Sequence, residues 1–255
     1  NNLSKIYKTS GGSLSVRKSS VSALEGVSFS VSQGQTLGIV GESGCGKSTL
    51  GRVISRLDTP TAGEIIFKGV DIAGKSLSAM RPLRKSIQFI FQDPYASLNP
   101  RRQIGAIVEE PLRINGVSKE ERRTQAQALL ERVGLDKGDY EKYPHEFSGG
   151  QKQRIVITRA LALHPKLVVC DEPVSALDVS VQAQIINLLK DIQERLGVSY
   201  LFVAHDLGVV RQISQRVMVM YLGEIVESAL KSDLYAHPLH PYSQALLSAI
   251  PRPKP

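Results

Sequence analysis

Residues 41–48 read Gly-Glu-Ser-Gly-Cys-Gly-Lys-Ser and fit the pattern G-x-x-x-x-G-K-[ST] in full. The apolar run Thr36 to Val40 precedes them, and a helical pattern begins near Ser48, which is the strand–loop–helix context that the pattern requires. Glycines let backbone N–H groups curl around phosphates, and a helix N-terminus adds a favourable dipole. Lys47 adds a cation for the phosphates, and Ser48 offers a hydroxyl to Mg²⁺. The stretch predicts a phosphate-binding loop rather than a glycine-rich turn with a chance Lys-Ser.

A second stretch carries two carboxylates. The apolar run Leu167 to Cys170 ends in Asp171 and Glu172, so a strand tip would present both acids. Asp171 would hold Mg²⁺ through water beside the phosphate loop, and Glu172 would polarise an attacking water as a general base. Acidic residues often simply end a strand, so the prediction depends on the pairing with the phosphate loop.

The hydrophobic pattern along the chain predicts an α/β fold. Short, nearly continuous apolar runs are typical of a mostly parallel sheet covered on both faces. One helical stripe is predicted from Val181 to Leu196, and Gly197 supplies its C-terminal stop. The predicted strands are Leu3 to Tyr7, Thr36 to Val40, Ile87 to Phe91, Leu167 to Cys170, Tyr200 to Val203 and Val217 to Tyr221.

We predict a single domain over residues 1–255 with three parts. Residues 1–94 and 151–230 would form the nucleotide-binding core with an N-terminal antiparallel β subdomain. Residues 95–150 contain no strand pattern, and the sequence from Ser118 to Glu121 resembles a capping box, so this part would be an inserted helical subdomain. Residues 9–20 would be a hairpin loop, and residues 231–255 would be a C-terminal tail on the surface.

Composition narrows the class of protein. The 255 residues are 42% hydrophobic and 22% charged, as in an ordinary globular protein, and no apolar run is long enough to cross a bilayer. Two cysteines, Cys45 and Cys170, cannot form a disulfide framework, so a reducing compartment is expected. Cys45 would be a small filler in the phosphate loop, and Cys170 would be a core residue. The net charge of +8 is spread over scattered basic residues, which favours a solvated surface over a nucleic-acid groove.

Five motifs together resemble those of ABC transporter ATPases. Residues 147–151 read Phe-Ser-Gly-Gly-Gln, which is similar to the signature motif of that family, and residues 171–178 resemble its joined Walker B motif and D-loop. Gln92 matches the Q-loop glutamine, His205 the switch histidine, and Tyr7 the aromatic residue that stacks on adenine. A half-buried strand aromatic, a structural histidine and an ordinary loop glutamine are the alternatives for these three residues.

The resemblance implies a phosphate-loop NTPase core that hydrolyses ATP with Mg²⁺. Catalysis would fall to Glu172, His205 and Gln92, and the metal would be held by Ser48, Gln92 and Asp171. The nucleotide would be bound by Tyr7, Gly41, Glu42, Ser43, Gly44, Cys45, Gly46, Lys47, Ser48 and Thr49. The D-loop would comprise Ser175, Ala176, Leu177 and Asp178, and the signature motif that contacts the ATP of a partner subunit would comprise Ser148, Gly149, Gly150 and Gln151.

The resemblance also implies partners and a location. Two such domains, identical or different, would stack head to tail around two ATP molecules and drive integral membrane permease subunits at the cytoplasmic face of a bacterial membrane. Residues 92–101 and 237–251 are similar to dipeptide, oligopeptide and nickel importer ATPases, which receive solute from an extracytoplasmic binding protein. Because Asn1 stands where Met is expected, the chain would be a cut from a longer protein or half of a tandem. A cysteine segment for an iron–sulfur cluster would then lie beyond residue 255 or be absent.

Two other classes remain open at this point. A soluble ABC ATPase acting on ribosomes or DNA would account for the net charge, although no nucleic-acid partner is expected without a long coiled-coil insertion. An exporter ATPase would be fused behind membrane helices, which the importer-like C-terminal stretch argues against.

Overall fold

The computed structural model describes residues 1–9 and 19–249, which fall into two compact units. Unit 1 contains residues 1–83 and 201–255, and unit 2 contains residues 84–200. Within the described ranges, no helix combines the length and the apolar character needed to cross a membrane. The predicted loop at residues 9–20 lies mostly outside the described residues.

Unit 1 begins with an antiparallel layer. Strands β1 (Leu3–Thr9) and β2 (Ser19–Val27) pair with Tyr7 opposite Val21. The short strands β4 (Ile66–Phe67) and β5 (Val70–Asp71) form a hairpin whose two turn residues, Lys68 and Gly69, both have positive φ angles, of 50° and 77°. Two successive residues with positive φ give a turn whose twist matches that of the two flanking strands. The predicted antiparallel β part is therefore present.

Unit 1 also contains parallel strands, which come from distant parts of the sequence. Strand β3 (Thr36–Val40) pairs in parallel with β9 (Arg216–Tyr221), and β10 (Glu224–Leu230) adds to β9 antiparallel. All five residues of β3 are buried, as expected for a strand with both faces covered. A Cβ at Gly38 would lie 2.4 Å from Val210 Cγ1, so only glycine allows helix α8 (Leu207–Ile213) to pack this closely on β3.

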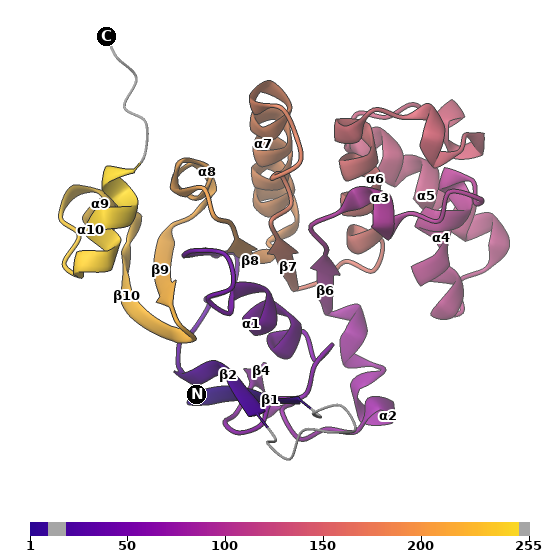
Figure 1. The fold of residues 1–255 in the computed structure, drawn as a ribbon. Coiled ribbons are helices and arrows are strands. Elements are labelled where there is room, and N and C mark those ends of the chain that lie inside the picture. Colours follow the sequence, from indigo (N-terminus) through magenta and orange to yellow (C-terminus); the bar gives the residue numbers. More distant parts are fainter. Residues whose placement is uncertain (10–18, 250–255) are drawn as a thin grey trace, which may run out of the picture. The chain divides into compact units, whose positions relative to one another are not determined.

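The C-terminal stretch of unit 1 is more ordered than a tail. It forms α9 (Lys231–Ala236) and α10 (Pro241–Ser248), and α9 contacts β10 (Figure 1). Leu234 is fully buried and Ser243 is 1% exposed. Helix α1 (Lys47–Ile54) and the short helix α2 (Leu77–Met80) complete this unit, and a 3-10 turn at Leu83–Lys85 joins it to unit 2.

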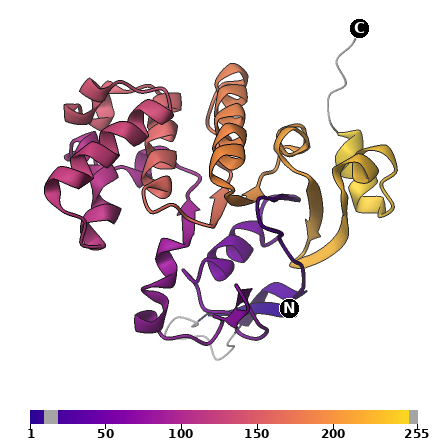
Figure 2. The same ribbon diagram turned by 180° about the vertical axis from the view of Figure 1, so that it is seen from behind.

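Unit 2 pairs β6 (Ile87–Ile90) in parallel with β7 (Leu167–Asp171), so Ile87 lies opposite Leu167. Between these strands the described chain is helical. The helices are α3 (Pro94–Ser97), α4 (Ile104–Ile114), α5 (Lys119–Arg132) and α6 (Gly149–Leu161), with 3-10 turns at Lys137–Glu141 and Pro144–Glu146. Helices α4, α5 and α6 contact one another, and both views show them together (Figures 1 and 2). The lack of a strand in this part is as predicted.

Two helices of unit 2 confirm sequence signals. Helix α5 begins after Ser118, whose Oγ accepts a hydrogen bond from Glu121 N–H at 3.3 Å. Helix α7 (Val179–Leu196) ends at Gly197, which has a left-handed φ of 62°. The interior of its predicted stripe is buried, at Ile185, Leu188, Leu189 and Ile192, while Leu196 is 36% exposed.

Strand β8 (Ser199–Val203) contains the division between the units. All six strands predicted from the sequence are present, each within two residues of its predicted ends. The predicted three-part subdivision does not coincide with the two units, since residues 95–150 share unit 2 with β6, β7 and α7. That subdivision stays a prediction.

Candidate nucleotide site

The phosphate loop of unit 1 connects β3 to α1, as predicted. Two of its glycines are required by close contacts: a Cβ at Gly41 would lie 2.2 Å from Met220 O, and one at Gly46 would lie 2.4 Å from Ala23 O. Gly46 also has a φ of 106°, which side chains other than glycine rarely adopt, and it is the residue from which α1 begins. The loop therefore leads directly into a helix N-terminus, where an anion is favoured.

Lys47 turns back onto its own loop. Its Nζ donates to Gly41 O and to Glu42 O, both at 2.7 Å, and lies 3.9 Å from Cys45 Sγ. Only 4% of Lys47 is exposed, whereas Ser48 is exposed. The loop thus holds an ammonium group at a fixed place among its own backbone groups.

The two cysteines are free thiols and both are buried. Burial raises the pKa of Cys45 and of Cys170 above the ordinary value, so both stay protonated at neutral pH. This environment agrees with the expectation of a small filler in the loop and a core residue in β7.

Tyr7 has its hydroxyl fixed and its ring partly open. The hydroxyl donates to Asp58 Oδ2 at 3.0 Å, and Asp58 in turn pairs with Arg52 at 2.9 Å. Burial and the Asp58 carboxylate raise the pKa of Tyr7, and the Arg52 guanidinium lowers the pKa of Asp58. Lys5 Nζ lies 4.8 Å from the ring centroid, and Tyr7 as a whole is 38% exposed. The ring is therefore oriented by its hydroxyl and remains available for stacking.

His205 follows β8 in unit 1 and is exposed. The preceding residue, Ala204, donates its N–H to Ile39 O at 3.1 Å, which ties the strand end to β3. The following residue, Asp206, caps α8, and its Oδ1 accepts from Gly208 N–H at 2.6 Å. His205 therefore lies between two fixed backbone segments.

In unit 2, the strand β7 ends in the two predicted carboxylates. Asp171 is 7% exposed, and Glu172 has a φ of 46°, a left-handed conformation that is strained for any residue with a side chain. Gln92 Nε2, just beyond β6, donates to Glu172 Oε2 at 3.1 Å. Strain of this kind is common at functional sites, where surrounding contacts hold it in place.

The D-loop residues form a tight turn after Glu172. Ser175 donates to Glu172 O through its N–H at 3.3 Å and through its Oγ at 3.0 Å. Asp178 lies at the N-cap of α7 and is exposed. This turn sets the direction in which α7 leaves the strand.

The signature residues form a closed helix start. Ser148 Oγ accepts from Gln151 N–H at 3.4 Å, and Gln151 Oε1 accepts from Ser148 N–H at 3.0 Å, which together make a capping box at α6. A Cβ at Gly150 would lie 2.5 Å from Val181 Cγ1, so glycine is needed where α6 meets α7. These residues therefore form the capped first turn of α6.

Helix α3, which follows Gln92, is fixed against α6. Lys152 Nζ lies 4.2 Å from the Tyr95 ring centroid, and Arg159 Nη1 donates to Ser97 O at 2.6 Å. Burial lowers the pKa of Arg159, in keeping with a guanidinium enclosed between the two helices. The segment after Gln92 and the signature helix are thus built as one block within unit 2.

The predicted residues therefore form two groups. Unit 1 holds Tyr7, the phosphate loop and His205, while unit 2 holds Gln92, the two carboxylates, the signature motif and the D-loop. That the two groups meet around one nucleotide stays a prediction. Within the described chain, no group of three or more His, Cys, Asp and Glu side chains could hold a metal by itself.

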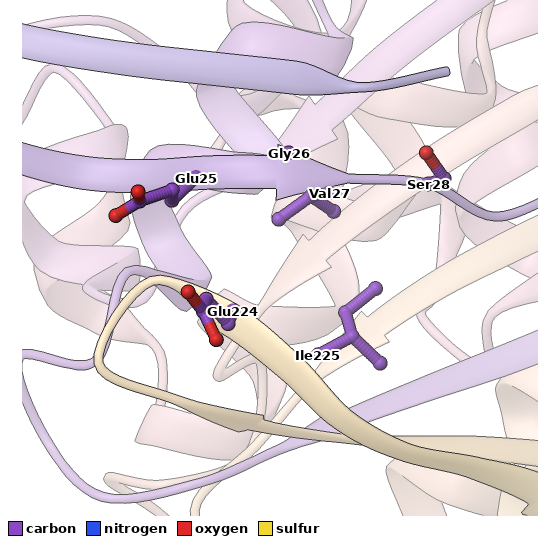
Figure 3. Close-up of a pocket in the computed structure, with 6 residues that line it drawn as sticks. All are labelled: Glu25, Gly26, Val27, Ser28, Glu224 and Ile225. Carbon is purple, nitrogen blue, oxygen red and sulfur yellow. The ribbon is translucent and has the colours of Figure 1, made fainter.

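A pocket of about 380 Å³ in unit 1 involves none of the predicted residues (Figure 3). It lies between β2 and β10, with the Glu25 and Glu224 side chains toward one end and Val27 and Ile225 toward the other (Figure 3). Because none of the motif residues lines it, we do not assign it a part in nucleotide binding.

One further residue at the phosphate loop was not predicted from the sequence. Tyr242 of α10 accepts a hydrogen bond from Glu42 N–H at 2.9 Å, although 200 residues separate the two. A tyrosine after a proline near the end of a chain carries no local signal of such a contact.

Comparisons with known proteins agree with these motifs. A family model described as "ABC transporter" matches residues 24–175, more than half of the chain. The chain is 54% identical over 236 residues to the dipeptide transport ATP-binding protein DppF of Escherichia coli (strain K12), covering 92% of this chain and 71% of that protein. It is also 54% identical over 249 residues to the oligopeptide transport ATP-binding protein AppF of Bacillus subtilis (strain 168), covering 97% of this chain and 76% of that protein.

Solved structures give the same result. A dimeric, post-hydrolysis structure of the ATP-binding cassette MJ0796 bound to ADP and Pi has a TM-score of 0.79 and 32% identity, covering 90% of this chain and 97% of that one. The structure of cbiO1 from Clostridium perfringens, part of the ABC transporter complex cbiONQ, has a TM-score of 0.79 and 28% identity, covering 92% of this chain and 89% of that one. The chain belongs to the ATP-binding subunits of the ABC transporter family.

Proposed function

We propose that this chain is the ATP-hydrolysing subunit of an ABC importer that takes up peptides. The observation that carries the proposal is its 54% identity to the dipeptide transport protein DppF, which extends over 92% of the chain. Its site would lie at the cytoplasmic face of a bacterial membrane, where permease subunits are its partners. A related solute such as nickel is the alternative, because residues 92–101 and 237–251 resemble nickel importer ATPases as well as peptide importer ATPases.

The residues of unit 1 would bind ATP. The backbone N–H groups of the phosphate loop and Lys47, already fixed by Gly41 O and Glu42 O, would hold the phosphates. The open face of the Tyr7 ring would stack on adenine, with its orientation set by Asp58.

The oxygen ligands present fit Mg²⁺. This ion binds through few protein oxygens together with phosphates and water, so a dedicated cage of three acids is not needed. Ser48, which is exposed beside the loop, together with Asp171 and Gln92, would hold it. When bound, Mg²⁺ neutralises charge that develops on the phosphates.

The residues of unit 2 would carry out the proton transfer. A water oxygen would attack the γ-phosphorus while the bond to the β–γ bridging oxygen breaks, giving ADP and phosphate. Glu172 would accept the proton of that water, and Gln92, its hydrogen-bond partner, would help to orient the water. His205 would contact the γ-phosphate while negative charge develops on that phosphate.

A second ATPase domain would complete the site. The N-terminus of α6 would face the γ-phosphate held by the other subunit, since a helix N-terminus favours an anion. ATP would then favour the closed dimer, because only that state offers both sets of donors. The dimeric cassette of MJ0796 bound to ADP and Pi supports this arrangement.

The proposal can be tested through the partners. The chain would be co-expressed with the permease and binding-protein genes that neighbour its own, and the binding protein titrated with dipeptides, longer peptides and Ni²⁺. We expect the chain to co-purify with the permease, and peptide-loaded binding protein to stimulate its ATPase activity. Binding of Ni²⁺ alone would reassign the solute, while stimulation by RNA or DNA without membrane partners would favour the soluble alternative, which no comparison supports.

A further inference from the structure

We propose that Tyr242, on the C-terminal helix α10, is a positioning residue that sets the phosphate loop for ATP. The inference rests on the proposed function, because it concerns the same site. It assigns to the C-terminal stretch, which the sequence suggested was a surface tail, a direct part in nucleotide binding.

Tyr242 and Lys47 hold the same peptide group. The N–H of Glu42 donates to the Tyr242 hydroxyl at 2.9 Å, and Lys47 Nζ donates to Gly41 O at 2.7 Å. Gly41 C=O and Glu42 N–H are the two ends of one planar peptide unit, so fixing one end fixes the other. Hydrogen bonds in such a chain also polarise one another. The Tyr242 hydroxyl therefore acts on the position of the Lys47 ammonium through one rigid group.

The hydroxyl is presented by a rigid support. The Tyr242 ring packs against Tyr221 at the end of β9, with ring centroids 4.5 Å apart. Ahead of the helix, the Glu227 carboxylate of β10 accepts from Leu239 N–H at 2.9 Å and from His240 N–H at 3.0 Å. His240 Nδ1 then caps the helix by accepting from Tyr242 N–H at 3.2 Å. Each step from β10 to the hydroxyl is thus held by a hydrogen bond or a ring contact.

The loop has little freedom to compensate for a lost contact. Gly223 N–H, in the turn after β9, donates to Cys45 O at 2.9 Å, and Met220 O lies so close to Gly41 that no side chain fits. Burial raises the pKa of Tyr242, so the hydroxyl stays neutral next to a site for phosphates. These contacts are all made by β9, its following turn and α10.

A purely structural role for the hydroxyl makes a different prediction. In that case it would only dock α10, and its removal would lower the thermal stability without changing the binding of ATP well below the melting temperature. In a positioning role, its removal weakens ground-state and transition-state contacts with the phosphates alike, so KM for ATP rises while kcat stays unchanged.

The experiment compares Tyr242→Phe with Tyr221→Phe, which removes the hydroxyl of the other ring in the pair. Steady-state hydrolysis, titration with a fluorescent ATP analogue and thermal melting would be measured for both. For Tyr242→Phe we expect KM and Kd to rise roughly three- to tenfold, as for the loss of one hydrogen bond, with kcat within about twofold of wild type. Tyr221→Phe should leave both constants unchanged.

A second variant guards against poor folding of the first. Glu227→Gln removes one of the two acceptors ahead of α10 while keeping the Tyr242 hydroxyl, and it should raise KM in the same direction by a smaller factor. Unchanged KM and Kd in both variants, with lowered melting temperatures, would overturn the inference while the proposed function stands. A wild-type chain that neither binds nor hydrolyses ATP would overturn the proposed function itself.

Discussion

Gln92 donates its side-chain amide to the Glu172 carboxylate, from Nε2 to Oε2 at 3.1 Å. The two residues are 80 positions apart in the sequence and are brought together by the parallel pairing of β6 with β7. The proposed general base therefore has a neutral partner, contributed by the segment that leads into α3.

Replacing Gln92 by Ala should lower ATP hydrolysis more than ATP binding. The amide donates to the Glu172 carboxylate and would hold it in place, so kcat should fall roughly 10- to 100-fold, within the range for misplaced catalytic groups. Kd for ATP should change by less than about threefold. Steady-state kinetics and nucleotide titration would check this, and a kcat within twofold of wild type would rule out an orienting role.

Replacing Glu172 by Gln should separate binding from chemistry. The amide keeps the size of the side chain but cannot accept the proton of water, so hydrolysis should fall by about 10²- to 10⁴-fold. ATP binding should persist, and gel filtration with ATP should show a stable dimer that the wild type forms only briefly. Near-normal turnover in this variant would remove Glu172 from the role of base.

Gly150 is expected to serve both packing and function. In Gly150→Ala the new Cβ would lie 2.5 Å from Val181 Cγ1, and overpacking of this kind costs about 1–3 kcal/mol of the free energy of unfolding. The double variant Gly150→Ala/Val181→Ala should regain most of that stability. If the glycine is also needed beside the ATP of a second subunit, hydrolysis in the double variant should stay reduced. Chemical denaturation and ATPase assays would show both effects, and full activity in the double variant would leave Gly150 a packing residue only.

Two substitutions at Tyr7 test adenine stacking. Tyr7→Ala removes the ring, and the loss of one base–aromatic stack costs about 1–3 kcal/mol, so the affinity for ATP should fall roughly 5- to 150-fold. Tyr7→Phe keeps the ring and loses the hydroxyl with its bonds to Asp58 and Thr49, so it should bind ATP within about threefold of wild type. Equal affinities for wild type and Tyr7→Ala would support the alternative of a half-buried strand aromatic.

Tyr140 should make stability depend on alkaline pH. Burial and its hydrogen bond to Glu109 raise the pKa of Tyr140 to about 12. Because the pKa in the unfolded chain is about 10, the stabilisation is complete below pH 10 and is lost as the pH rises through 12. Urea unfolding should show Tyr140→Phe less stable than wild type at pH 8, with the difference shrinking between pH 10 and 12. Parallel stability curves over this range would contradict the assignment.

Much of the fold follows from local patterns. Continuous apolar runs predicted the buried strands within two residues at each end, because a strand covered on both faces leaves no room for polar side chains. Ser118 and Gly197 predicted helix ends, since each satisfies backbone groups within its own turn. These signals are local, and they carry over directly into the structure.

Other features depend on contacts across the chain. The bond between Glu42 and Tyr242 spans 200 residues, and no periodicity marks either partner. Glycine is needed at position 150 because Val181 of α7 lies close to it. The signature motif pointed to this glycine, but its packing against α7 could not be predicted from the sequence. Helices α9 and α10 were missed because they are six and eight residues long, too short for a helical stripe to stand out in the sequence. The roles of the individual site residues remain predictions for the same reason, since they depend on which side chains surround one nucleotide.

The left-handed backbone at Glu172 lowers the stability of the fold at the residue that is the proposed general base. Glycine adopts such a conformation freely, while any other residue there costs on the order of 1–3 kcal/mol. A glycine at this position would relieve that strain and raise the thermal stability, and if Glu172 is the general base it would also remove the group that accepts the proton of water. Screening for thermal robustness alone would therefore enrich inactive variants at position 172, and an engineered form of this protein should keep this one costly residue fixed.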